Sequence, residues 1–195
     1  MNIAIYGGSF NPIHSGHVNL ALSLVKQGLV GRVWLLVSPQ NPLKANCNDG
    51  GVGDEVQPTY SDRLKMAQMA CRGIKEVVVS DFERHLPVPS YTINTMTELS
   101  KKYPQHQFSL IIGADNWVNF RKWYNYEEIL KNYKIFVYKR PGYTISVPQI
   151  YADRVIVVDN ALYDVSSTEI RNHIKTDMLH EDVLEYIKQK HLYGY

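Results

Sequence analysis

Apolar residues along this chain follow two alternating patterns. Short apolar runs typical of β-strands occupy residues 2–6, 32–37, 75–82, 107–112, 134–138 and 154–158. Apolar residues recur at helical spacing in the segments 18–26, 61–72, 92–103, 126–133 and 181–190, with a shorter helix expected at 120–123. Strands that alternate with helices assemble into a parallel sheet through right-handed crossovers. The pattern therefore predicts an α/β fold, a Rossmann-like doubly wound domain with a mainly parallel sheet flanked by helices.

Capping signals refine several of these boundaries. Gly28 is placed to end the first helix and Ser61 to begin the second. Ser166, with Glu169 three residues later, fits a capping box that opens a further helix. The inward face of the second helix is expected to contain Leu64, Ala67 and Cys71.

Residues 45–58 interrupt the alternation of strands and helices. They are rich in Gly, Asn and Asp and nearly free of large apolar groups, so we interpret them as a mobile surface loop. A lid over a ligand and a simple insertion both remain open. The C-terminal part, residues 166–195, is expected to be helical, and no repeat or second domain is evident, so one domain spanning residues 1–195 is predicted.

Charge and cysteine content exclude some classes of protein. A formal net charge of +2 on 195 residues is too small to indicate a nucleic-acid partner. Cys47 and Cys71 lie far apart without a C-x-x-C motif, and the chain begins with a strand rather than a signal peptide. No apolar run is long enough to span a bilayer. We expect a cytoplasmic protein without a membrane or nucleic-acid partner. The sequence leaves open whether the protein forms a homo-oligomer.

The junction of the first strand and first helix, residues 7–17, reads GGSFNPIHSGH. Its paired glycines permit unusual torsions and close backbone approach. A helix that begins near Ser15 points its free N–H groups and its positive dipole end at this turn. His14 and His17 project from one side of that helix start. The residues predict a phosphate site, with an exposed histidine pair or a zinc pair as the alternatives.

This segment resembles the signature of the HxGH nucleotidyltransferase superfamily, in which G-G-[ST]-F-[DN]-P-x-H-x-G-H follows the first strand. Residues 165–171 read VSSTEIR and match a second segment of that superfamily, [IV]-S-S-T-x-[IL]-R. Taken alone, these residues also suit an ordinary capped helix with a solvated Arg171. The dinucleotide fingerprint G-x-G-x-x-G and the P-loop motif are absent. The resemblance implies adenylyl or cytidylyl transfer onto a phosphate without a covalent enzyme intermediate.

Two further segments resemble the branch of bacterial nicotinate-nucleotide adenylyltransferases. Residues 113–115 read GAD, and Trp123 follows at the spacing of that branch; residues 89–92 read PSYT. Lys44 and Arg140, the latter in the segment KRPG at residues 139–142, are candidates for binding the mononucleotide phosphate, although single basic residues are usually solvated. A tryptophan offers a flat apolar face to a pyridine ring, although core packing is its usual role. Thr92 could equally serve as a plain helix cap. The sequence departs from the branch at Asn11, where Asp is commoner, and at Leu43, where His is frequent.

The resemblance implies a set of site residues. The catalytic residues would be His14, His17 and Arg171, acting as cations on the triphosphate. The ATP-binding residues would be Gly7, Gly8, Ser9, Phe10, Gly16, Gly113, Asp115, Ser166, Ser167 and Thr168. The mononucleotide-binding residues would be Lys44, Ser90, Tyr91, Thr92, Trp123 and Arg140. No protein ligand to a metal is expected, and Mg²⁺ would arrive on the ATP phosphates.

The implied reaction is attack by the 5′-phosphate of nicotinate mononucleotide on the α-phosphorus of ATP, giving nicotinate adenine dinucleotide and pyrophosphate. A phosphate monoester with a second pKa of about 6 is largely ionised at neutral pH, so the nucleophile needs no general base. Nicotinamide mononucleotide and phosphopantetheine are the alternative acceptors. A nucleotide-binding sensor without catalysis is the alternative from another class of protein.

Overall fold

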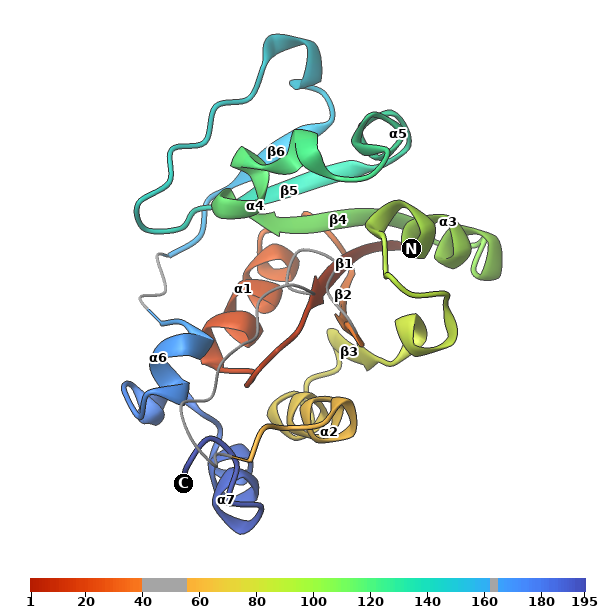
Figure 1. Ribbon diagram of the computed structural model, residues 1–195. Helices are drawn as coiled ribbons and strands as arrows, with labels where there is room; N and C mark the ends of the chain where they lie inside the picture. Colours follow the sequence, from red (N-terminus) through yellow and green to blue (C-terminus); the bar gives the residue numbers. More distant parts are fainter. Residues whose placement is uncertain (40–55, 162–164) are drawn as a thin grey trace.

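The computed structural model describes residues 1–39, 56–161 and 165–195, and six parallel strands form its sheet (Figure 1). The order across the sheet is β3-β2-β1-β4-β5-β6. The strands are β1 (Asn2–Gly8), β2 (Arg32–Val37), β3 (Val77–Ser80), β4 (Gln107–Gly113), β5 (Lys134–Tyr138) and β6 (Val155–Val158). This arrangement confirms the predicted doubly wound α/β fold.

The chain begins in the middle of the sheet and reverses its direction of winding there. It runs outward through β2 and β3 and then returns to place β4 on the other side of β1. Ile5 therefore pairs with Trp34 on one neighbouring strand and with Leu110 on the other. The carboxyl ends of β1 and β4 flank this switch point, where open α/β sheets bind their ligands.

Helices cover both faces of the sheet (Figure 1). They are α1 (Ser15–Lys26), α2 (Tyr60–Ala70), α3 (Thr92–Lys102), α4 (Ala114–Val118), α5 (Tyr126–Asn132), α6 (Ser167–Arg171) and α7 (Glu181–Gln189), with the 3₁₀ helices η1 (Phe82–His85), η2 (Phe120–Lys122), η3 (Gln149–Tyr151) and η4 (Thr176–Met178). One apolar core joins the sheet to α1, α2 and α7 through Leu24, Met66 and Ile187. A second core joins the opposite face to α3 and α5 through Met96 and Ile129.

Several predicted boundaries need correction. Thr59, rather than Ser61, caps α2, because its hydroxyl accepts from the Asp62 N–H at 3.2 Å while the Asp62 carboxylate accepts from the Thr59 N–H at 2.9 Å. Ala67 and Cys71 are buried as expected, but Leu64 is only half-buried. The strand expected at 75–82 is shorter, since η1 begins at Phe82.

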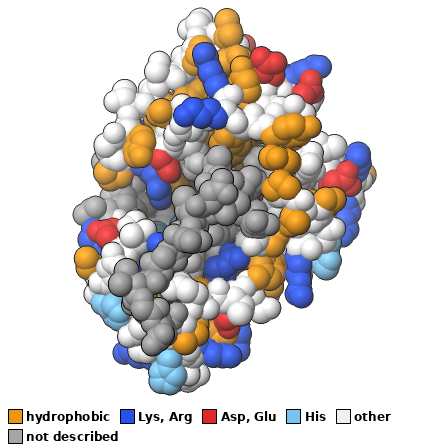
Figure 2. Space-filling view, viewed as in Figure 1, with side chains coloured by type: hydrophobic (Ala, Val, Ile, Leu, Met, Phe, Trp, Pro, Cys, Tyr) orange, Lys and Arg blue, Asp and Glu red, His pale blue; other side chains and the backbone are white. Residues whose placement is uncertain are grey.

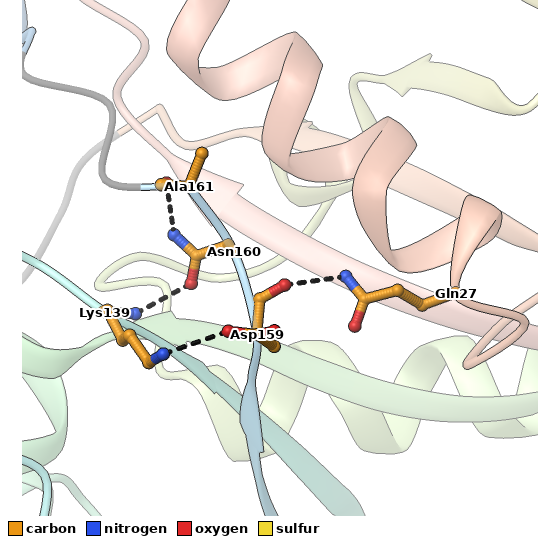
Figure 3. Close-up of polar contacts among 5 residues, drawn as sticks. All are labelled: Gln27, Lys139, Asp159, Asn160 and Ala161. Atoms are coloured by element: carbon orange, nitrogen blue, oxygen red, sulfur yellow. Dashed lines mark hydrogen bonds and ion pairs between the residues drawn. The ribbon is translucent and has the colours of Figure 1, made fainter.

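Polar contacts fix the ends of β5 and β6 (Figure 3). Lys139 donates its main-chain N–H to Asn160 Oδ1 and its ammonium to Asp159 Oδ1, each at 3.0 Å. The Asn160 amide donates to the Ala161 oxygen at 2.8 Å, and Gln27, next to the end of α1, donates to the Asp159 oxygen at 3.0 Å. These bonds join the first helix to the edge of the sheet from which the chain leaves toward α6.

Two of the sequence predictions, Lys44 and most of the loop expected at 45–58, concern residues that the structure does not describe. Lys44 and residues 45–55 of that loop lie outside the described ranges. Its last residues are described, and Val56 forms a parallel bridge with Leu192 near the C-terminus. Within the described ranges, no helix is both long and apolar enough to cross a membrane.

Candidate active site

A cavity of about 400 Å³ opens at the carboxyl ends of β1, β4 and β5. From the predicted ATP side it is lined by Gly7, Gly8, Ser9, Phe10, His17, Gly113, Asp115, Ser166, Ser167, Thr168 and Arg171. From the predicted mononucleotide side it is lined by Ser90, Tyr91, Thr92, Trp123 and Arg140. His14 and Gly16 line a small adjoining cavity of about 30 Å³ instead. Segments from both ends of the chain therefore meet at one place.

The turn after β1 depends on close packing more than on glycine torsions. A Cβ on Gly8 would lie 3.1 Å from the ring of Phe10, so glycine allows that ring to approach the strand. The left-handed torsion in this turn belongs to Phe10, with φ of 44°, and not to either glycine. A non-glycine residue in this conformation costs about 1 kcal/mol or more, and only a surrounding structure that fixes it can keep it there.

The start of α1 packs against the segment that precedes α6. A Cβ on Gly16 would lie 2.9 Å from Val165 Cγ1 and 3.0 Å from Nδ1 of His14. Real Cβ atoms essentially never approach closer than 3.0 Å, so any larger residue would push these neighbours apart. Glycine at position 16 therefore brings the two signature segments into contact.

His14 and His17 lie face to face, with ring centroids 3.7 Å apart. Nδ1 of His17 accepts from the His14 main-chain N–H at 3.2 Å, so a neutral His17 carries its proton on Nε2. His17 lines the large cavity, where Nε2–H is the donor left for a ligand. His14 is 4% exposed, and neither of its ring nitrogens has a hydrogen-bond partner among the described residues.

In the protein without ligand, the surroundings of both imidazoles favour their neutral form, and their action as cations on a triphosphate stays a prediction. Burial, together with repulsion from the nearby Arg140 guanidinium and against the attraction of the Glu169 carboxylate, lowers the pKa of His14 to about 4. Burial also lowers the pKa of His17 well below its ordinary value, with added repulsion from His14 and Arg140. The zinc alternative finds no third ligand, since no group of three or more His, Cys, Asp or Glu side chains gathers in the described parts of the chain.

Helix α6 binds directly to the turn that follows β1. Nη1 of Arg171 donates to the Asn11 oxygen at 2.7 Å, and the Ser167 hydroxyl donates to the Pro12 oxygen at 2.9 Å. The interpretation of Arg171 as a solvated cation is therefore wrong. The predicted capping box is confirmed, because the Ser166 hydroxyl accepts from the main-chain N–H of the residue three positions on and donates to its carboxylate.

Asp115 and Arg140 form an ion pair in the cavity wall, with Oδ2 and Nη1 3.4 Å apart. The Arg140 guanidinium also lies over the Tyr138 ring, 5.7 Å from its centroid. A Cβ on Gly113 would collide with Asp115 Oδ1 and would lie 3.0 Å from the Tyr138 hydroxyl. Glycine at position 113 thus leaves room for the carboxylate, whose Oδ1 has no partner among the described residues.

The start of α3 and Trp123 form the opposite wall. Tyr91 is the cap residue of α3 and Thr92 its first helical residue, so the interpretation of Thr92 as a plain cap is wrong. The buried Ser90 hydroxyl and Trp123 Nε1 have no hydrogen-bond partner in the described residues. The ring centroids of Trp123 and Phe120 lie 5.2 Å apart, and Trp123 also lines the cavity, so the ring packs in the core and borders the site, while its contact with a ligand stays a prediction.

Comparison with known proteins places this architecture in a family. The sequence model of the cytidylyltransferase-like family matches residues 5–173. This chain belongs to the cytidylyltransferase-like family. The match spans both the turn after β1 and the helix α6 that binds it.

Relatives of this cytidylyltransferase-like protein share most of its length. It is 40% identical over 97% of its length to the "probable nicotinate-nucleotide adenylyltransferase" of Bacteroides thetaiotaomicron, covering 92% of that protein. A protein of the same name from Flavobacterium johnsoniae is 37% identical, with 99% of each chain covered. The nicotinic acid mononucleotide adenylyltransferase of Plasmodium falciparum, solved with NaAD, has a TM-score of 0.76 at 18% identity, covering 100% of this chain and 98% of that one. This last similarity supports the fold.

The cytidylyltransferase-like site also contains polar residues that sequence reasoning missed. Glu83 is 7% exposed, lines the cavity and accepts from the Thr95 hydroxyl at 2.9 Å. Burial raises the pKa of Glu83, and hydrogen bonds from the Thr95 and Ser38 hydroxyls partly oppose this. Tyr193 is fully buried, and its hydroxyl donates to Asn11 Oδ1 at 2.6 Å. Nothing in the local sequence around Glu83 or Tyr193 distinguishes them.

Arg63 is the third residue that sequence reasoning missed, and here a signal exists. It precedes Ala67 by four residues, as Ala67 precedes Cys71, so a charged residue occupies the inward face of α2. The structure buries Arg63 to 9% exposure.

The outer surface of this cytidylyltransferase-like protein is mixed in character (Figure 2). On the face shown, hydrophobic side chains form a band to the right of the centre. The visible Lys and Arg side chains of the described residues are scattered among other groups rather than joined into one patch. In the cavity wall, positive charge comes from the individual side chains of Lys122, Arg140 and Arg171.

Proposed function

We propose that this chain transfers the adenylyl group of ATP to nicotinate mononucleotide, giving nicotinate adenine dinucleotide and pyrophosphate. The observation that carries the proposal is the bond between Arg171 and Asn11, which joins the two superfamily segments beside one cavity. The opposite wall of that cavity contains the PSYT turn and Trp123. Relatives over most of the chain are named for this activity.

The triphosphate would lie against the turn after β1 and the start of α1. Free main-chain N–H groups, the positive end of α1 and the His17 Nε2–H supply hydrogen-bond donors there. Arg171 supplies a permanent charge. A phosphate charge about 4 Å from His17 would favour its protonated form by roughly 4 kcal/mol at an effective dielectric of about 20. Binding of ATP would therefore oppose the effect of burial and draw a proton onto the histidine.

The nucleophile would be the 5′-phosphate of the acceptor, already ionised at neutral pH. No general base is required, so the barrier arises from repulsion between two anions and from charge that develops on pyrophosphate. Donors fixed in place before the reaction stabilise that charge without reorganising, and each 1.4 kcal/mol of such stabilisation is worth about tenfold in rate. Direct in-line displacement by the acceptor phosphate leaves no covalent enzyme intermediate.

Magnesium would enter as part of the substrate, MgATP. The described residues gather no group of three or more His, Cys, Asp or Glu side chains to hold the ion. Triphosphate oxygens and water are the ligands that Mg²⁺ commonly keeps when a protein provides few carboxylates. The chain would thus position the nucleotide rather than the metal.

The acceptor would lie between Trp123 and the start of α3. The Trp123 ring offers a face for the pyridine, and the Ser90 hydroxyl with the N–H groups at the start of α3 suits its carboxylate. Arg140 is the candidate for the mononucleotide phosphate, together with Lys44, and Asp115 for the ATP sugar. The ion pair of Arg140 with Asp115 would then stand between the two nucleotides.

A comparison of acceptors tests this proposal. Pyrophosphate release would be measured with MgATP and, in parallel, nicotinate mononucleotide, nicotinamide mononucleotide or phosphopantetheine. We expect kcat/KM for nicotinate mononucleotide to exceed the others by at least tenfold. A preference for the amide or for phosphopantetheine would reassign the acceptor. Nucleotide binding without pyrophosphate release would identify a sensor instead.

A further inference from the structure

Arg63 places a guanidinium behind the turn that follows β1. It projects from the first part of α2, and its side chain is almost completely buried. Nη1 donates to the Ser9 oxygen at 2.6 Å and to the Ser38 oxygen at 3.0 Å. Both acceptors are main-chain oxygens just beyond β1 and β2, at the edge of the sheet where the cavity opens.

A buried cation is unusual at this position, because the neighbouring inward-facing positions of α2 are occupied by apolar residues. Met66 and Ala67 are fully buried there. Removing a charge from water is costly unless hydrogen bonds satisfy it. Arg63 meets that condition with two main-chain oxygens and the Tyr60 ring, whose centroid lies 5.6 Å from its guanidinium carbon. An apolar side chain could fill the space, but it could not bind those oxygens.

The bond to Ser9 has a consequence on the other side of the same peptide. In a trans peptide the C=O and the next N–H point in opposite directions. Holding the Ser9 oxygen toward Arg63 therefore directs the Phe10 N–H away from α2. That N–H has no acceptor among the described residues. Phe10 also has the unfavourable positive φ of this turn, so its orientation needs external support.

We propose that Arg63 is a positioning residue for the triphosphate site, because it holds the Ser9 and Ser38 oxygens and so keeps the Phe10 N–H turned toward bound phosphate. This inference rests on the proposed function for the identity of the ligand. Arg63 does not line the cavity, whereas Ser9 and Phe10 do. It therefore acts through the turn and not by contact with the nucleotide.

Side chains also bind main-chain oxygens on the other side of the turn. Arg171 and Ser167 of α6 bind the oxygens of Asn11 and Pro12. Side chains from α2 and α6 thus hold the carbonyl oxygens of the turn from two directions. Carbonyl oxygens repel phosphate, so turning them outward is what an anion site requires.

The test compares Arg63→Met and Arg63→Lys with a matched control, Arg72→Met. Arg72 lies just beyond α2, its side chain is 70% exposed, and it pairs with Asp182 at the surface. The lysine side chain is one bond shorter than arginine, so we expect its ammonium to hold one of the two oxygens but not both. The measurements are Tm, kcat, the KM values for ATP and nicotinate mononucleotide, and the Kd of a non-hydrolysable ATP analogue without acceptor.

We expect Arg63→Met to raise the KM for ATP and the Kd of the analogue at least tenfold, while the KM for nicotinate mononucleotide changes less than twofold. Arg63→Lys should raise the first two values at least threefold, and Arg72→Met should leave all of them unchanged. Equal changes in both KM values, or none in a folded variant, would overturn the proposal. If Arg63→Met fails to fold, Arg63→Lys decides by the same criteria. If wild-type protein transfers no adenylyl group, the proposed function fails, and the analogue Kd still tests Arg63.

Discussion

Arg171 and Asn11 are 160 positions apart in sequence, yet the guanidinium donates to the Asn11 main-chain oxygen at 2.7 Å. The second terminal nitrogen of Arg171 donates to the Thr168 hydroxyl at 3.1 Å. Arg171 thereby fixes the turn that follows β1 and presents its charge at the same cavity. A residue with both roles should affect stability and turnover together.

Replacement of Arg171 by Met should lower kcat/KM for ATP at least tenfold. It should also lower the free energy of unfolding by about 2 kcal/mol, since a hydrogen bond from a charged donor is lost. Urea unfolding and steady-state kinetics measure the two effects. Arg154→Met, at an exposed arginine after η3, is the control for both. A variant with reduced stability but normal kinetics would show that Arg171 only holds the turn.

Replacement of His17 by Ala should lower kcat at least tenfold in a protein that remains folded, because the Nε2–H donor to the triphosphate is removed. His17→Gln should retain more activity than His17→Ala, since its amide can place an N–H near the same point. His85→Ala, at a histidine whose side chain is 72% exposed, provides the control. Unchanged turnover in His17→Ala would remove this imidazole from the mechanism.

The buried His14 should make the free protein sensitive to mild acid. Its pKa is about 6.5 in the unfolded chain and about 4 in the folded protein, so the unfolded chain binds more protons between these values. Stability is therefore fully present above about pH 6.5 and is lost as the pH falls through this window. By pH 5 the loss from His14 should reach about 2 kcal/mol.

Urea unfolding at pH 7 and pH 5 measures this dependence. His14→Gln cannot titrate, so its stability should fall between the two pH values by about 2 kcal/mol less than that of the wild type. Equal losses in both proteins would show that His14 does not carry the acid sensitivity.

Replacement of Trp123 by Ala should raise the KM for nicotinate mononucleotide at least fivefold and change the KM for ATP less than twofold. The ring lines the acceptor side of the cavity, and loss of aromatic stacking costs about 1 kcal/mol beyond the lost burial. Trp123→Phe should restore most of the affinity. Trp34→Phe, at a tryptophan that packs against Tyr103 and Phe108, is the matched control. Equal effects of Trp123→Ala on both KM values would place the pyridine elsewhere.

Much of this architecture could be predicted from the sequence. The strand and helix pattern yields the parallel sheet, because each run has a clear period. The turn at residues 7–17 and the α6 segment could be recognised because each matches a superfamily motif at many positions at once. Their meeting in space follows from the resemblance. The structure supports it, because Val165 packs so closely against Gly16 that position 16 has no room for a β-carbon.

Other parts of the site could not be read from the sequence. Glu83 and Tyr193 act through hydrogen bonds to residues distant in sequence, and a lone residue has no periodicity or motif to mark it. The protonation of His14 and His17 depends on burial, which neither their spacing nor their neighbours in sequence reveal. A cytoplasmic location and the oligomeric state stay predictions.

The central claim is that one cavity joins ATP to nicotinate mononucleotide directly. The most direct test is to mix the purified protein with MgATP and nicotinate mononucleotide and to quantify pyrophosphate and nicotinate adenine dinucleotide in the same sample by mass spectrometry. The account predicts one pyrophosphate for each dinucleotide and neither product when either substrate is omitted. Pyrophosphate or ADP without the dinucleotide, or no turnover by folded protein, would contradict it.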